Sequence, residues 1–117
     1  MTEQGYNEFE KTLYDNGFKK SNGVVHGSDW YFYKAVRRKK DKYGDERAVS
    51  QLLYCIYDVR KYHDKDDYLL EKIIDVSRNV DERCEFTIMA DLGISEMEEL
   101  ADKFYDFVCK NVKLEED

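Results

Sequence analysis

Apolar residues repeat with a helical period at both ends of the chain and alternate between two faces in the middle. This order constrains the fold more than any other feature of the sequence. A 3.6-residue repeat gathers apolar side chains on one side of a helix, whereas a two-residue repeat gathers them on one face of a strand. We therefore expect helices over 3–16 and 95–111, with strands between them.

Both expected helices carry signals at their ends. Thr2 can cap the first helix, and Gly17 suits the left-handed residue that closes a helix. Before the second helix, Ser95 and Glu98 have the spacing of a capping box. The apolar stripe of this helix runs on to about Asn111.

Four segments are expected to be strands: 29–38, 48–60, 68–78 and 84–92. The first and the last alternate cleanly, and the second is apolar on both sides in its middle, which is typical of a central strand. The segment 68–78 is ambiguous, because its leucines and isoleucines also fit a helical stripe. Its β-branched residues and the strand that follows it favour a strand.

These elements predict an α+β fold with two layers. The expected sheet is a four-stranded antiparallel meander with the N-terminal and C-terminal helices on one of its faces. The polar connection 19–28 can hide a short edge strand at 24–25. We expect a single domain over 1–113 and a frayed tail over 114–117.

Charge is unevenly distributed along the chain. The net charge is −7, yet the segment 34–42 holds six cations and one anion. It follows a run of four aromatic residues, 30–33, and the last helix is strongly acidic. The sequence therefore predicts a molecule that is basic at one hairpin and acidic along its final element.

The aromatic and basic stretch supports three interpretations. It can be an ordinary strand that ends in a soluble turn, since rings pack well on pleated surfaces and cations keep strand edges soluble. It can be part of an open, tyrosine-rich sheet face used by a non-enzymatic protein-interaction module or homodimer. The alternative is a nucleic-acid-binding surface at the basic hairpin 34–42, which the net charge of −7 disfavours. The candidate binding residues are Tyr31, Tyr33, Tyr54, Arg37, Arg38, Lys39, Lys40 and Lys42.

Signatures of catalysis are missing from the sequence. There is no phosphate-binding glycine motif and no metalloprotease motif, so we expect no cofactor, no metal and no catalytic residue. The weak exception is the loop 62–67, where His63, Asp64, Asp66 and Asp67 could form a metal or enzyme site. A solvated turn explains the same residues more simply.

Cysteine usage and hydropathy suggest a location. The three cysteines are widely spaced and form no C-x-x-C pair, which favours reduced thiols over a disulfide framework or a zinc site. The chain lacks both an apolar leader and an apolar stretch long enough to cross a bilayer. We therefore expect a cytoplasmic protein with a protein partner or a second copy of itself, and no membrane.

Overall fold

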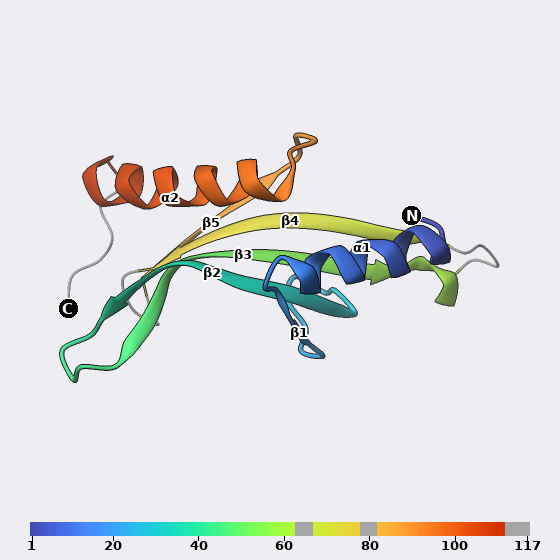
Figure 1. Ribbon diagram of the computed structural model, residues 1–117, viewed down its shortest axis with the longest axis horizontal. Helices are drawn as coiled ribbons and strands as arrows, with labels where there is room; N and C mark the ends of the chain where they lie inside the picture. Colours follow the sequence, from blue (N-terminus) through green and yellow to red (C-terminus); the bar gives the residue numbers. More distant parts are fainter. Residues whose placement is uncertain (63–66, 78–81, 112–117) are drawn as a thin grey trace. The chain divides into compact units, whose positions relative to one another are not determined.

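The computed structural model describes residues 1–62, 67–77 and 82–111 and contains two α-helices and one antiparallel sheet (Figure 1). The α+β class and the order of elements are confirmed, but the sheet has five strands instead of four, in the order β1-β2-β3-β4-β5. The elements are α1 (Glu3–Asp15), β1 (Lys19–Ser21), β2 (Trp30–Lys40), β3 (Glu46–Asp58), the 3₁₀ helix η1 (Val59–Lys61), β4 (Tyr68–Ser77), β5 (Arg83–Ile88) and α2 (Ile94–Asn111).

The additional strand, β1, lies inside the connection that we expected to be polar and irregular. It pairs antiparallel with β2, with Ser21 opposite Tyr31 and Lys19 opposite Tyr33. The short edge strand expected at 24–25 was therefore placed wrongly. The three residues of β1 are two lysines and a serine, and they show no alternation of apolar side chains. The strand therefore forms because it pairs with β2, and not because its own residues favour a strand.

Helix α1 begins and ends as its sequence predicts. The Thr2 side chain accepts a hydrogen bond from the Gly5 N–H at 3.1 Å. At the other end, Gly17 has a φ of +86°, and the Phe18 N–H donates to the Leu13 carbonyl at 3.0 Å. Because this bond spans from the second residue after the cap back to the last turn, the helix closes with a Schellman motif.

The described chain divides into two compact units, and β2, β3 and β4 contribute residues to both. The first unit comprises Met1–Lys34 and Leu53–Lys72, and the second comprises Ala35–Leu52 and Ile73–Asp117. The single domain over 1–113 remains a prediction. The predicted tail, 114–117, lies outside the described residues.

In the first unit, α1 packs on the sheet through aromatic side chains. Phe9 and Phe18 both contact the ring of Tyr54, with centroid distances of 6.0 and 5.1 Å. Tyr6 stacks on Tyr68 at 4.5 Å and accepts a hydrogen bond of 2.7 Å from the Trp30 indole. These contacts explain the helical spacing of the aromatic residues near the start of the chain.

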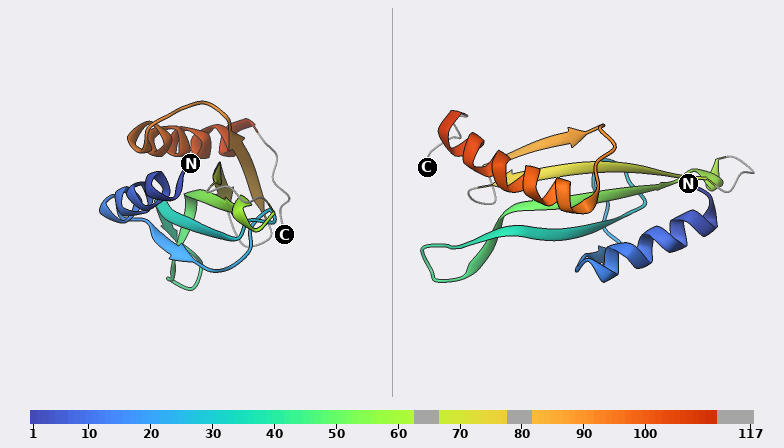
Figure 2. Two further views of the ribbon diagram at one scale, coloured as in Figure 1. Left: turned by 90° about the vertical axis from the view of Figure 1, so that its right-hand side faces the viewer. Right: turned by 45° about the horizontal axis from the view of Figure 1, so that its top comes forward.

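In the second unit, α2 lies alongside β5 (Figure 2). Phe104 of α2 stacks on Phe86 of β5 at 4.5 Å, and the buried Ser50 hydroxyl donates to the Ala101 carbonyl at 2.7 Å. The helix begins at Ile94, so Ser95 lies in its first turn and is not the cap that we expected. It includes Asn111, the last residue that the structure describes.

The ambiguous segment forms β4, which confirms the strand and excludes the helix. Four consecutive residues, 73–76, are buried in it, which fits an inner strand with both faces covered. The strand β5 alternates between exposed and half-buried residues as expected, but it ends at Ile88, before the predicted end at Leu92. None of the helices in the described ranges is long and apolar enough to cross a membrane.

Candidate functional site

The first unit has a sheet face that lies opposite α1. Contacts with α1 fix Phe32, Tyr54 and Tyr68 on the helix side of their strands. Because successive side chains of a strand point to opposite faces, their neighbours in sequence point away from α1. We call this surface the reverse face; its residues are Tyr31 and Tyr33 of β2, Leu53, Cys55 and Tyr57 of β3, and Leu69 and Glu71 of β4.

Two tyrosines of β2 form one side of the reverse face. The rings of Tyr31 and Tyr33 lie 5.9 Å apart and are tilted by 49°, and both side chains are half-buried. A Cβ atom at Gly23 would lie 3.4 Å from the Tyr31 ring, so the connection after β1 runs along the edge of this ring. The tyrosine pair is therefore accessible from one side only.

Tyr57 is held in the middle of the same face. Its hydroxyl lies 3.1 Å from the His26 carbonyl and 3.3 Å from Glu71 Oε1. Burial and the neighbouring carboxylate of Glu71 raise the pKa of Tyr57 to about 12. The phenol therefore stays protonated near neutral pH and acts as a hydrogen-bond donor.

The β4 side of the reverse face carries one exposed apolar side chain, Leu69. Leu69 is 54% exposed, although it lies inside β4, whereas Leu53 and Cys55 of β3 are buried. Leu69 is the second residue of β4, so its exposed side chain lies near the start of the strand. Cys55 is a free thiol and is buried as a small apolar residue.

One predicted binding residue does not belong to this surface. Tyr54 is 2% exposed and lies between the rings of Phe9 and Phe18 in the core. The parity of β3 explains the correction, because even-numbered residues of this strand face α1 and the odd-numbered Tyr57 faces away. The sequence predicted Tyr54 as a binding residue without the register that decides which face of β3 it occupies.

The predicted basic hairpin forms in the second unit, at the turn between β2 and β3. Asp41 organises this turn, because its side chain accepts hydrogen bonds from the Tyr43 and Asp45 N–H groups at 2.9 and 3.0 Å. Its other oxygen accepts from Arg47 Nε at 2.7 Å, and this bond lowers the pKa of Asp41. The single acid of the basic stretch is therefore fully engaged within the turn.

Arg37 is not a free cation. Its guanidinium donates to Asp106 at 2.8 Å, lies 3.6 Å from Asp102, and stands 4.5 Å from the centre of the Tyr105 ring. The hydrogen bond to Asp106 is the main cause that raises the pKa of Arg37. This arginine therefore joins the basic hairpin to the acidic helix, and the separation of charge expected from the sequence is partly neutralised within the second unit.

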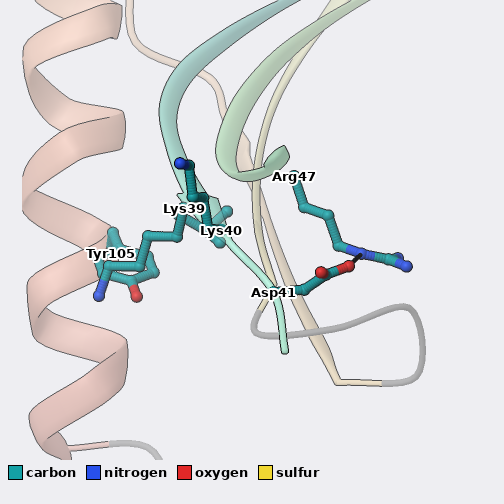
Figure 3. Close-up of a pocket in the computed structure, with 6 residues that line it drawn as sticks. Lys39, Lys40, Asp41, Arg47 and Tyr105 are labelled. Atoms are coloured by element: carbon teal, nitrogen blue, oxygen red, sulfur yellow. Dashed lines mark hydrogen bonds and ion pairs between the residues drawn. The ribbon is translucent and has the colours of Figure 1, made fainter. Parts of the chain in front are cut away.

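Beside the hairpin lies a pocket of about 190 Å³ (Figure 3). Lys39 reaches toward Tyr105 of α2, and its Nζ lies 4.9 Å from the centre of that ring. Tyr105 and Val49 are both 5% exposed and supply fixed walls. The pocket is lined by Lys39, Lys40, Asp41, Arg47, Val49 and Tyr105.

The remaining predicted residues contribute less. Arg38 is exposed on β2, and the Lys42 Nζ lies 5.2 Å from the Tyr43 ring; neither residue lines the pocket. His63, Asp64 and Asp66 of the 62–67 loop lie outside the described residues. Within the described ranges, no group of three or more metal-ligating side chains could hold an ion.

Sequence reasoning missed two residues of these surfaces. Leu69 was placed in an ambiguous segment, and only the strand assignment shows which face it occupies. Tyr105 lies on α2 and was omitted from the predicted apolar stripe, although it follows Ala101 by four residues and precedes Val108 by three. That spacing was the available signal for its inward position.

Comparison of the chain with protein families, with curated proteins and with solved structures finds no match. Inferences about function therefore rest on the geometry of the reverse face and of the hairpin.

Proposed function

We propose that the protein is a non-enzymatic interaction module that contacts a second copy of itself through the reverse face. The observation that supports this most directly is the 54% exposure of Leu69, the second residue of β4, on the same sheet face as a half-buried pair of tyrosines on β2. Tyrosine is enriched in protein interfaces because its ring is large and rigid and its hydroxyl tolerates partial hydration.

The distribution of side chains on the reverse face favours a second copy as the partner. Rings lie on β2 and the exposed leucine lies on β4, with β3 between them. A two-fold axis running along β3 would place β2 of each copy over β4 of the other. The tyrosines of one chain would then cover Leu69 of its partner twice, which is the reciprocal pattern of a symmetric dimer.

The mass of the chain in solution tests this proposal. We expect sedimentation equilibrium to give a mass that rises from 14.0 kDa toward twice that value as the concentration increases. The variant Leu69→Lys should remain monomeric, because a charge would be desolvated in the interface. Tyr43→Lys is the matched control: Tyr43 is 76% exposed but lies in the hairpin of the second unit, so this variant should dimerise as wild type does.

Two results would contradict the proposal. One is a wild-type chain that stays at 14.0 kDa into the millimolar range. The other is a dimer that Leu69→Lys leaves intact while the circular dichroism spectrum is unchanged, since the contact would then lie elsewhere on the molecule.

Binding of nucleic acid is a second candidate, favoured by the cluster of cations on the hairpin. Two of its arginines are engaged: Arg37 pairs with Asp106 and Arg47 pairs with Asp41. Phosphate contacts would have to compete with these carboxylates. We therefore expect binding of a single-stranded oligonucleotide to be weak and to disappear at moderate salt.

A further inference from the structure

We infer that the pocket beside the β2–β3 hairpin binds a phosphate monoester. This inference does not depend on the proposed dimer, because the pocket lies entirely within the second unit and the reverse face lies within the first.

The net charge of the pocket depends on which of its charged side chains pair with each other. Asp41 and Arg47 neutralise each other through a bond of 2.7 Å, and Asp41 also accepts two backbone hydrogen bonds. Among the described residues, Lys39 and Lys40 have no carboxylate partner. Two positive charges thus remain at the pocket, which matches the charge of about −1.5 to −2 on a phosphate monoester at neutral pH.

The type of cation favours phosphate over carboxylate. A planar carboxylate is best held by the two-pronged fork of an arginine. Arg37 and Arg47 are engaged with Asp106 and Asp41, and Arg38 does not line the pocket. The two ammonium groups act as point charges that can approach a tetrahedral group from different sides, and lysine is a common phosphate ligand for this reason.

The walls of the pocket set the size and character of the group that carries the phosphate. Its volume of about 190 Å³ is small, which suits a phosphate with a short organic stem. Tyr105 and Val49 are almost fully buried and therefore hold their positions, so the stem would lie against an aromatic ring and an aliphatic side chain. A small aromatic or aliphatic monoester fits this description, and a nucleic-acid duplex does not.

A titration of the full-length, ¹⁵N-labelled chain with phenyl phosphate tests the inference. We expect saturable shifts of the Lys39, Lys40 and Tyr105 amide signals, with a dissociation constant in the millimolar range at low salt. Benzoate, which has the same ring with a carboxylate, should bind at least several-fold more weakly. Inorganic phosphate should shift the same signals, but with lower affinity, because it cannot contact the Tyr105 wall.

Substitutions separate specific binding from a general effect of charge. Lys39→Gln and Lys40→Gln should each weaken phenyl phosphate binding about tenfold, the factor expected for one charge-assisted hydrogen bond. Lys42→Gln is the matched control, because it removes a cation from the same hairpin without touching the pocket. Both pocket lysines are exposed, so the folded state should persist, and circular dichroism can verify this.

A comparison of ligands shows whether the phosphate is carried by a polypeptide or by a small molecule, and it includes the results that would overturn the inference. Tighter binding of a phosphoserine peptide than of free phosphoserine would support the inference and assign the ligand to a polypeptide; equal binding would support it with a small molecule as ligand. The inference is overturned if benzoate binds as well as phenyl phosphate, or if Lys42→Gln weakens binding as much as Lys39→Gln. It is also overturned if an oligonucleotide binds far more tightly with a steep salt dependence, since the hairpin would then be a polyanion surface.

Discussion

The Arg37 guanidinium donates a 2.8 Å hydrogen bond to Asp106 and lies against the ring of Tyr105, one residue earlier on α2. A strand and a helix that are 69 residues apart in sequence are thus joined by one side chain. The same contact neutralises a cation that sequence reasoning had assigned to ligand binding. It makes Arg37 a structural residue of the second unit.

We expect Arg37→Gln to lower the free energy of unfolding by roughly 0.5–1 kcal/mol, the usual range for a partly exposed ion pair with a cation–π contact. Urea denaturation followed by circular dichroism would measure the change. Arg38→Gln, at the next position of the strand, is exposed and should leave stability unaltered. If both variants lost the same free energy of unfolding, glutamine itself would be unfavourable in this strand. The specific role of Arg37 would then be refuted.

A larger effect is expected at Arg83, which compensates a buried carboxylate. Asp75 is 2% exposed and accepts hydrogen bonds from Arg83 at 2.7 Å and from Gln51 at 2.9 Å. Removing the cation by Arg83→Ala leaves the buried carboxylate of Asp75 with the hydrogen bond from the Gln51 amide but without its ion pair, so the free energy of unfolding should fall by about 3 kcal/mol. The double variant Arg83→Ala, Asp75→Asn has no buried charge at this position, so it should recover part of the lost free energy of unfolding in the same denaturation experiment. A double variant less stable than Arg83→Ala alone would contradict the explanation.

The turn before β2 contains backbone strain that a substitution should relieve. His26 has a φ of +54° and is followed by Gly27 at +78°. Successive positive φ angles favour asparagine before glycine, and a histidine in this conformation is less favourable. The contact of His26 with Tyr57 uses the backbone carbonyl and survives substitution. We therefore expect His26→Asn to raise the free energy of unfolding by about 0.5 kcal/mol; a clear loss would show that the imidazole itself contributes to stability.

Stability in acid should depend on Asp29. Its carboxylate pairs with Lys61 and accepts a hydrogen bond of 2.7 Å from the Asp58 N–H, and the bond from Lys61 is the main cause that lowers the pKa of Asp29. A carboxylate whose pKa is lower in the folded state than the unfolded value of about 3.9 stabilises the protein above that value. This contribution is lost as the pH falls through the folded pKa.

The variant Asp29→Asn should consequently melt at a lower temperature than wild type at neutral pH. The two melting temperatures should approach each other as the pH falls below about 4, and they should converge once the pH has passed through the lowered pKa of folded Asp29. Thermal melts over a pH series would test this. A difference that persists unchanged in acid would mean that packing of the side chain, and not its charge, is responsible.

Most of the fold could be predicted from periodicity and from the chemistry of helix ends. The Schellman motif at Gly17 and the alternation in β5 were both predicted and are both present. The strand β1 could not be predicted, because its three residues are extended only through pairing with β2. Local sequence carries no signal for such a strand.

The surfaces were harder to predict than the fold. A shift of one residue exchanges the two faces of a strand, so the sequence could not decide between Tyr54 and Tyr57. The cations of the hairpin were visible in the sequence, but their partners were not. The pairing of Arg37 with Asp106 depends on how α2 packs within the second unit, which is a tertiary property.

The brevity of β1 has a consequence for how the chain behaves in concentrated solution. An edge three residues long with two lysines offers few backbone groups to an incoming extended segment, and the lysines oppose close approach of an identical edge. Further chains should therefore not add to the sheet along the edge formed by β1. Fibrils, if they form under stress, should begin from another part of the chain.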